Sequence, residues 1–151
     1  MKVWRLCSTR HAAMDGEGAR LNGGRWNHPG TAVIYTSATL SLAVLEMLVH
    51  VDSDLLPLDL IAVSAEFPSQ LPIRTVAEEA LPRDWRTYPA PESTQSLGTV
   101  WAHSGDTVVL AVPSVVGPDE GNYLLNPVHP DFHKITWSAP RPFQWDVRLL
   151  S

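Results

Sequence analysis

Glu46 is the ionisable residue whose sequence surroundings point most clearly to chemistry. It lies in the stretch LSLAVLEMLVH, between Leu45 and Met47, where almost every neighbour is apolar. In a helix, Leu42 and His50 would lie on the same face as Glu46. Because an ionised carboxylate is costly to bury without a partner, two interpretations stay open. Glu46 either sits half-exposed on a helix edge, or it borders a functional cleft or meets an arginine.

Arg25 is the second candidate. It follows Gly23 and Gly24 in the loop-like stretch GARLNGGRWNHPG, directly before an apolar run. Glycines let a backbone approach a phosphate closely, and arginine can bind phosphate oxygens with two parallel hydrogen bonds. The spacing matches neither the phosphate-binding P-loop nor the dinucleotide fingerprint GxGxxG. Spacing alone therefore leaves a phosphate-binding loop and an ordinary surface turn as alternatives.

Ser114 and the segment HPDFH are weaker candidates. Ser114 follows an expected strand but lacks the GxSxG elbow, so its position favours ligand binding over nucleophilic attack. His129, Asp131 and His133 alternate, and on a strand they would share a face that could bind a metal. A proline-containing loop that carries polar residues is the favoured interpretation, and no metal site is predicted.

Periodic apolar residues predict the elements that must position these side chains. Residues 37–50 are expected to form a helix with Ser37 as N-cap, ended by the segment 52–57; it should be largely buried because it is apolar nearly all round. Residues 75–81 and 92–103 are expected to be further helices, with loops at 13–30 and 82–91. Strands are predicted at residues 3–6, 31–36, 60–67, 107–112, 122–126, 134–137 and 143–149. These elements indicate a single mixed α/β domain over residues 1–151, with strands in the majority.

Composition narrows the function classes. The chain has 151 residues and a formal net charge of −5. This charge argues against a general nucleic-acid binder but permits a small anionic ligand held by a few groups. Cys7 is the single cysteine of the sequence, so no internal disulfide is expected and a reducing compartment is favoured. Neither a signal-peptide core nor an apolar run of ~18 residues occurs, which predicts a cytoplasmic protein.

The order of several short motifs resembles that of the RES-domain proteins, the toxins of RES–Xre type II toxin–antitoxin systems. The matching segments are GGRWN, TAVIYTS and AVLEMLVH, then VVLAVPSVV, and finally NYLLNPVHPDF; the resemblance extends from Trp4 to Phe132. It implies an α/β (α+β) fold like that of ADP-ribosyltransferases, with a split β-sheet core and flanking helices. It also implies consumption of NAD by cleavage of the nicotinamide–ribose bond, with water, phosphate or a protein side chain as acceptor.

The same resemblance implies that residues from distant parts of the chain line one NAD cleft. It implies catalytic roles for Arg25, Tyr35, Glu46 and Ser114, and contacts with NAD for Arg10, Gly24, Arg25, Tyr35, Ser114 and Asn122. Arg25 would hold the diphosphate or ribose side of NAD, and Tyr35 would pack against the nicotinamide ring. Glu46 and Ser114 match the family's glutamate and serine.

The resemblance implies partners as well. An antitoxin with an Xre-like helix-turn-helix region would block the cleft with its C-terminal part, and the toxin could form a homodimer within that complex. NAD is implied as substrate, with no further cofactor, no metal, no membrane and no direct nucleic-acid contact. Two other functions stay open. One is a protein mono-ADP-ribosyltransferase with a specific target, and the other is a non-catalytic module that binds NAD or docks the antitoxin.

Overall fold

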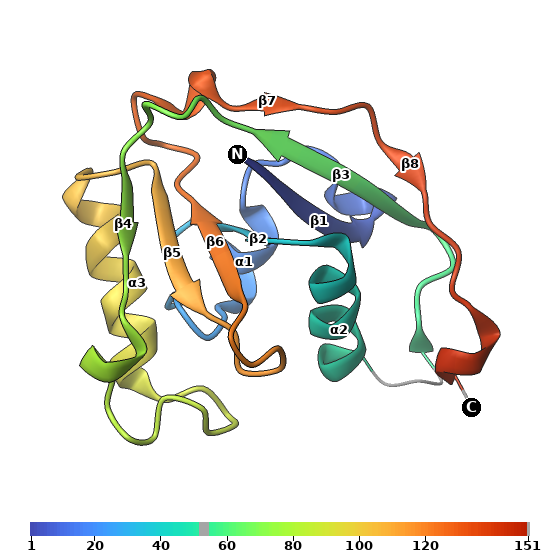
Figure 1. Ribbon diagram of the computed structural model, residues 1–151, viewed down its shortest axis with the longest axis horizontal. Helices are drawn as coiled ribbons and strands as arrows, with labels where there is room; N and C mark the ends of the chain where they lie inside the picture. The colour runs from blue at the N-terminus through green and yellow to red at the C-terminus, as the bar shows by residue number, and fades with distance from the viewer. Residues whose placement is uncertain (52–54, 151) are drawn as a thin grey trace.

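The computed structural model describes residues 1–51 and 55–150, and its centre is an eight-stranded sheet (Figure 1). The strand order is β4-β5-β6-β2-β1-β3-β7, and β8 also pairs with β3. The strands are β1 (Lys2–Ser8), β2 (Ile34–Ser37), β3 (Leu60–Glu66), β4 (Ile73–Thr75), β5 (Val109–Pro113), β6 (Gly121–Leu125), β7 (Thr136–Trp137) and β8 (Arg141–Pro142). In the described ranges the α-helices are α1 (Glu17–Asn22), α2 (Leu40–His50) and α3 (Glu92–Ser104).

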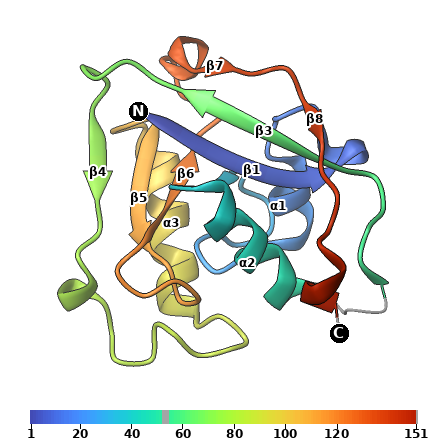
Figure 2. The ribbon, with the colours of Figure 1, turned by 45° about the vertical axis from the view of Figure 1, so that its right-hand side comes forward.

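The sheet is split between β1 and β2. These two strands pair at one position, Trp4 opposite Ser37, whereas β1 pairs with β3 along its whole length. All four residues of β2 pair with β6 on its other side. Figures 1 and 2 show the result: β1 and β3 cross the molecule obliquely, while β4 and β5 run steeply. The predicted α/β fold with a split sheet is confirmed.

Buried apolar residues hold each part of the sheet. Six of the seven residues of β3 are buried, as expected for a run of small and β-branched side chains in a central strand. At the other end, α3 packs on β5 and β6 through a cluster that contains Trp26, Trp85 and Trp101. This cluster also fastens two loops to α3, because Trp26 belongs to the glycine-rich loop and Trp85 to the segment 82–91.

Helix α2 differs from its prediction in both start and burial. Ser37 is the last residue of β2, and Thr39 is the N-cap, whose side chain accepts a hydrogen bond from the Leu42 N–H. The predicted N-cap is therefore wrong. Leu42 is fully buried, but Leu45 and Val49 are exposed, because α2 contacts β1 and β2 on one side. The prediction of a largely buried helix is wrong as well.

Three further predictions need correction. The loop predicted at 13–30 contains α1, and the helix predicted at 75–81 is reduced to the 3-10 turn Glu78–Ala80. The strand predicted at 143–149 does not form, since Phe143 and Trp145 pack against the apolar cluster beside α2 and Val147–Leu150 is a 3-10 turn. Two half-buried aromatic rings produced that alternation without a ladder of β hydrogen bonds.

The other predicted strands and the helix at 92–103 are present with shifted ends. The strand expected at 134–137 is shortened to β7, because a 3-10 turn occupies Phe132–Lys134. The predicted break at 52–57 includes residues 52–54, which lie outside the described residues. Within the described ranges, no helix has the length and apolar character needed to cross a membrane.

Candidate active site

The split in the sheet borders a cleft of about 850 Å³, a volume typical of small-molecule sites. Its walls come from β1, β2, α2, the glycine-rich loop and the segment 82–91. The lining includes most residues of the predicted site, namely Arg10, Gly24, Arg25, Tyr35, Glu46 and Asn122. Ser114 is buried and is linked to the cleft through its hydrogen bond to Glu46. The structure thus brings these residues together.

Glu46 is held by two hydrogen bonds to the same carboxylate oxygen. Its Oε1 accepts from Ser114 Oγ at 2.9 Å and from Asn122 Nδ2 at 2.7 Å. Its Oε2 lies 4.0 Å from His50 Nε2, and the side chain is 24% exposed. Two donors on one oxygen restrict the rotation of the carboxylate. The second oxygen keeps its capacity to accept a hydrogen bond from a group in the cleft.

Ser114 has used its hydroxyl to hold Glu46. While Ser114 Oγ donates to Glu46, it accepts from the backbone N–H groups of Val116 at 3.2 Å and Gly117 at 3.0 Å. A hydroxyl has one proton to donate, so no proton remains for a ligand in this arrangement. Ser114 is therefore placed to position Glu46 rather than to attack a substrate.

Asn122 extends this arrangement into the sheet. Ser37 and Asn122 lie opposite each other in the β2–β6 ladder, and Ser37 Oγ donates to Asn122 Oδ1 at 2.8 Å. The amide is thereby oriented with its N–H groups toward Glu46. Ser37 was predicted as a helix cap, and its part in this chain of hydrogen bonds depends on strand register, which no local pattern reveals.

Arg25 is anchored by its guanidinium to the segment 82–91. Nη1 donates to the carbonyl oxygens of Trp85 at 2.7 Å and Thr87 at 2.9 Å. Burial lowers the pKa of Arg25, while the negative charge of Glu46 opposes that shift. Arginine remains charged despite such a shift. Nε and Nη2 form no hydrogen bond within the described residues, so this edge of the fork is available to an anion.

Tyr35 and Gly24 fit closely against each other. The Tyr35 hydroxyl donates to Asn27 Oδ1 at 2.7 Å and accepts from the Trp26 N–H at 3.0 Å. Burial raises the pKa of this phenol above its ordinary value, so Tyr35 stays protonated and is unsuited as a base. A Cβ added at Gly24 would lie 2.6 Å from the Tyr35 hydroxyl oxygen. Gly24 must therefore lack a side chain to accommodate Tyr35, whether or not a phosphate approaches.

Two residues were not found from the sequence: Arg5, which lines the cleft, and Asn27, which lies within the glycine-rich loop. Arg5 on β1 donates from Nη1 to the Tyr35 carbonyl at 3.2 Å, and its buried Nε has no hydrogen-bond partner among residues 1–51 and 55–150. Asn27 is fully buried and donates to the carbonyl oxygens of Ala19 and Thr31. Asn27 lies in the GGRWN motif, which is the one signal that could have indicated it. Arg5 carries no comparable signal.

Electrostatics of the cleft contrast with those of the whole chain. Four arginines line it: Arg5, Arg10, Arg25 and Arg86. Glu46 is the one carboxylate among its described lining residues, although the chain has a net charge of −5. Arg10 lies on the exposed 3-10 turn Thr9–His11, at the far end of β1. Such a concentration of guanidinium groups suits a ligand with more than one negative charge.

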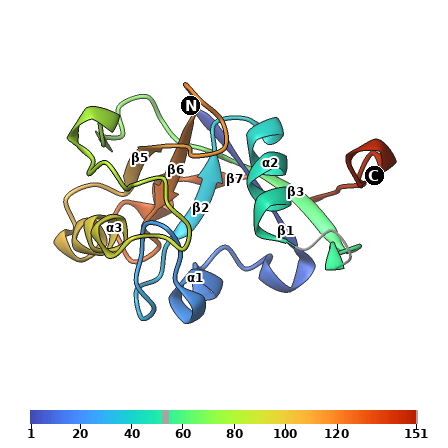
Figure 3. The same cartoon turned by 90° about the horizontal axis from the view of Figure 1, so that it is seen from below.

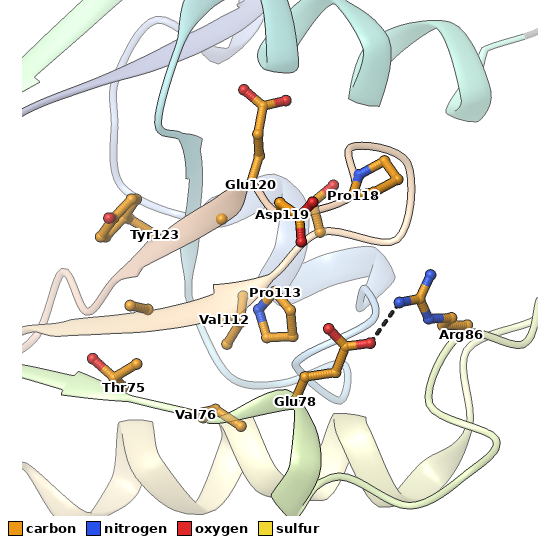
Figure 4. A pocket seen from close by; sticks show the side chains of 13 residues that line it. Thr75, Val76, Glu78, Arg86, Val112, Pro113, Pro118, Asp119, Glu120 and Tyr123 are labelled. Atoms are coloured by element: carbon orange, nitrogen blue, oxygen red, sulfur yellow. Dashed lines mark hydrogen bonds and ion pairs between the residues drawn. The ribbon is translucent and has the colours of Figure 1, made fainter.

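A smaller pocket of about 320 Å³ adjoins the cleft beside β5 and β6. Figure 4 shows Glu78 and Arg86 facing each other there, joined by an ion pair of 2.5 Å. Asp119 and Glu120 line the same pocket. Because Arg86 lines both spaces, Glu78 limits how freely Arg86 can turn toward the cleft.

The HPDFH segment forms turns rather than a strand. His129 Nε2 lies 3.0 Å from the Gly105 carbonyl oxygen, and His133 Nδ1 lies 2.8 Å from that of Pro130. Asp131 forms an ion pair with Lys134 at 3.2 Å. These side chains do not converge, and residues 1–51 and 55–150 contain no group of three metal-ligating side chains. The interpretation of this segment as a polar loop is confirmed.

Fold and cleft define a mixed α/β protein with a split sheet and a cleft of ligand-binding size between its parts. The RES domain matches residues 2–146, so the chain belongs to the RES-domain family. The Prs ADP-ribosylating toxin of Sphingobium sp. (strain YBL2) is 40% identical over 141 residues, covering 91% of this chain and 86% of that protein. Toxin Res of Yersinia enterocolitica is 39% identical over 154 residues, covering 99% of each.

A solved structure shares the fold. A chain from the crystal structure of the M. tuberculosis MbcT–MbcA toxin–antitoxin complex superposes with a TM-score of 0.73. The match covers 94% of this chain and 83% of that chain at 17% sequence identity. The family predicted from the order of the short motifs is confirmed, and the curated relatives are toxins.

Proposed function

We propose that this protein is the toxin of a toxin–antitoxin system and consumes NAD by breaking the bond between nicotinamide and ribose. The observation that carries the proposal is the Glu46 carboxylate, held by Ser114 and Asn122 in a cleft lined by arginines. An anchored carboxylate with one unused oxygen suits the stabilisation of a developing positive charge. The names of the curated relatives, Toxin Res and Prs ADP-ribosylating toxin, support the same reaction class.

In the proposed complex, Arg25 binds the diphosphate of NAD with the guanidinium edge that its backbone tethers leave open. Arg5, Arg10 and Arg86 add positive charge to the same cleft. The ring of Tyr35 packs against nicotinamide while its hydroxyl stays bound to Asn27. Binding the diphosphate at a fixed point restricts where the ribose can lie, which brings its anomeric carbon to Glu46.

In the proposed reaction, the bond between the ribose carbon and the nicotinamide nitrogen breaks, and its electron pair moves to that nitrogen. Nicotinamide leaves as a neutral molecule, so no general acid is required, and the ribose acquires oxocarbenium character. The negative charge of Glu46 stabilises this state more than it stabilises bound NAD. An acceptor then bonds to the ribose carbon and gives up its proton to Glu46 or to solvent.

Two acceptor classes are candidates. Water or inorganic phosphate would make the protein an NAD glycohydrolase or NAD phosphorylase, which depletes NAD directly. A protein side chain would make it a mono-ADP-ribosyltransferase, and the name of the Sphingobium relative favours this second candidate. The same described residues would break the glycosidic bond in both cases, so the acceptor has to be identified from the products.

Product analysis tests the proposal. Purified protein is incubated with NAD, with and without phosphate, and the products are identified by NMR. ADP-ribose indicates water as acceptor, and ADP-ribose 1-phosphate indicates phosphate. Glu46→Gln is the control, because its amide oxygen can still accept from Ser114 and Asn122 while the charge is lost. We expect Glu46→Gln to release nicotinamide about 10²- to 10³-fold more slowly.

The remaining outcomes separate the other candidates. Labelled NAD is added to a cell lysate with the protein, and label on one protein band identifies a transferase. Saturable NAD binding without release of nicotinamide identifies a non-catalytic module and overturns the proposal. A folded Glu46→Gln variant with wild-type turnover would remove Glu46 from the mechanism.

We further propose that an antitoxin binds this protein and blocks the cleft, consistent with the toxin–antitoxin complex of the structural neighbour. The proposed partner carries an Xre-like helix-turn-helix region, and the toxin forms a homodimer within the complex. The proposed reaction needs NAD and no metal, and it takes place in the cytoplasm. Co-expression with the antitoxin should relieve toxicity, and mass measurement of the purified complex should give two toxin copies.

A further inference from the structure

We propose that helix α3 sets the position of Arg25, with Gly98 and Gln95 as its positioning residues. This inference deepens the proposed function and rests on the role of Arg25 as the diphosphate-binding group. Neither Gly98 nor Gln95 has a catalytic role of its own in this scheme. They act on the ligand through the loop that carries Arg25.

Helix α3 approaches the loop that carries Arg25 very closely at Gly98. A Cβ added at Gly98 would lie 1.7 Å from the carbonyl oxygen of Trp26 and 2.8 Å from its carbonyl carbon. Trp26 directly follows Arg25, so this contact lies one residue from the functional side chain. No side chain fits at position 98 unless the loop backbone moves away from the helix.

Hydrogen bonds from the same helix hold the loop on both sides of Trp26. Gln95 Nε2 donates to the Gly24 carbonyl at 3.2 Å, one residue before Arg25. Thr99 Oγ1 accepts from the His28 N–H at 2.9 Å, and the His28 ring lies 3.0 Å from Ser96 Oγ. Gly98 and these polar residues therefore form one continuous contact with the loop.

The head group of Arg25 is held by a second loop that rests on the same helix. Trp85 and Trp26 pack with their ring centroids 6.3 Å apart, and both join the buried cluster around Trp101 of α3. The Trp85 and Thr87 carbonyls bind Arg25 Nη1. In Figure 3 the glycine-rich loop and the segment before α3 lie side by side next to this helix. Helix α3 thus fixes both the backbone of Arg25 and, through the segment 82–91, the position of its guanidinium.

This arrangement predicts an effect opposite to ordinary helix propensity. Alanine is a better helix former than glycine, so Gly98→Ala would stabilise a free helix. Here the added methyl group must displace the Trp26 carbonyl and, with it, Arg25. Displacements of this size in a binding group weaken ligand positioning strongly.

The test measures binding of ADP, which carries the diphosphate but no nicotinamide, by isothermal titration calorimetry. We expect Gln95→Ala to weaken ADP binding roughly threefold to tenfold, as for one lost hydrogen bond. Gly98→Ala should weaken it roughly tenfold or more. Val100→Ala is the matched control on the exposed side of α3 and should bind ADP as the wild type does. For NAD turnover, Gln95→Ala and Gly98→Ala should both raise KM, and Gly98→Ala should also lower kcat, because a displaced Arg25 no longer holds the ribose at Glu46.

A double-mutant cycle with Arg25→Ala distinguishes positioning from general destabilisation. If α3 acts through Arg25, Gln95→Ala should have less than about a twofold effect on ADP binding in the Arg25→Ala background. An equal effect in both backgrounds overturns the inference. Should Gly98→Ala fail to fold, the Gln95→Ala cycle carries the test by itself.

The outcomes also separate this inference from the proposed function. ADP binding that depends on Gln95 and Arg25, without nicotinamide release from NAD, leaves the inference standing and removes the proposed reaction. If the wild type cleaves NAD but Gln95→Ala binds ADP and turns over NAD as Val100→Ala does, the proposed function stands and this inference is overturned. A wild-type protein that neither binds ADP nor cleaves NAD contradicts both.

Discussion

At the scale of single residues, Glu46 and Ser114 share a hydrogen bond that determines what each can do. The bond engages the Ser114 proton and one oxygen of Glu46. Asn122 binds that same oxygen, so the carboxylate has two anchors, and loss of either should leave it partly oriented. The two residues should therefore differ in how strongly the proposed reaction depends on them.

Ser114→Ala tests this difference. The change removes one hydrogen bond to a charged group, which is worth about 1.5–3 kcal/mol. We expect kcat for nicotinamide release to fall about tenfold or more, with KM within about threefold, and the loss to stay smaller than in Glu46→Gln. Ser93→Ala, at an exposed serine on α3, is the control. Equal losses in Ser114→Ala and Glu46→Gln would instead indicate that Ser114 takes part in the chemistry.

Tyr35 makes a pH-dependent contribution to stability. Its pKa is raised by burial, while a tyrosine in the unfolded chain ionises near ~10. Because the folded state disfavours the ionised phenol, the contribution is fully present below pH ~10 and declines as pH rises further. Relative to Tyr35→Phe, the wild type should lose about 1.4 kcal/mol of unfolding free energy by pH 11.

Urea unfolding of the wild type and Tyr35→Phe at pH 8 and pH 11 measures this loss. Tyr88→Phe, at an exposed position, controls for removal of a hydroxyl and should leave stability at pH 8 unchanged. A difference between wild type and Tyr35→Phe that is the same at both pH values would contradict the raised pKa.

At the scale of elements, α2 presents a catalytic candidate from a helix buried on one side. Leu42, one turn before Glu46, is fully buried, and its Cδ1 would lie 2.7 Å from a Cβ at Gly117. The Gly117 N–H in turn donates to Ser114. Leu42 therefore supports the turn that orients Ser114, whereas Leu45 lies on the exposed side of the same helix.

The two leucines should consequently respond differently to truncation. We expect Leu42→Ala to lower the unfolding free energy by about 2–5 kcal/mol, because it opens a cavity under the Ser114 turn. Leu45→Ala should stay within about 0.5 kcal/mol of the wild type. Urea denaturation of both variants provides the comparison. Similar losses for both would show that the outer face of α2 is covered in solution.

At the scale of the whole molecule, the cleft lies where the sheet divides. Glu46 is on α2, which contacts β1, and Arg25 is on the loop that α3 holds in the other part of the fold. A ligand that reaches both residues links the two parts of the sheet. Binding should therefore stabilise the fold as a unit rather than one loop.

Thermal unfolding with NAD tests this linkage in Glu46→Gln, in which turnover is minimised. At NAD concentrations near 100 times Kd, we expect about 2.7 kcal/mol of stabilisation. For a domain of this size that corresponds to a Tm increase of roughly 5–10 °C. Adding Arg25→Ala should abolish most of the increase at the same NAD concentration. An undiminished increase would place the ligand away from Arg25.

Local patterns in the sequence determined the elements whose signals are local. The apolar run at residues 60–67 predicted β3, and the spacing of apolar residues at 92–103 predicted α3. Both signals are local, because burial of one face sets the spacing of apolar residues within a single element. Glu46 was also found from a local signal, because it is a charged residue among apolar neighbours in a predicted helix. The motif order then indicated the family and the residues of one cleft.

Tertiary structure alone decided how those elements meet. Register places Asn122 opposite Ser37 and so aims its amide at Glu46. Packing leaves one side of α2 exposed and makes Gly98 contact Trp26, far away in the sequence. Such contacts join residues separated by tens of positions, and no periodicity within a single segment can predict them. The sequence by itself therefore determined which residues are candidates for the chemistry, and the fold determined how they are held.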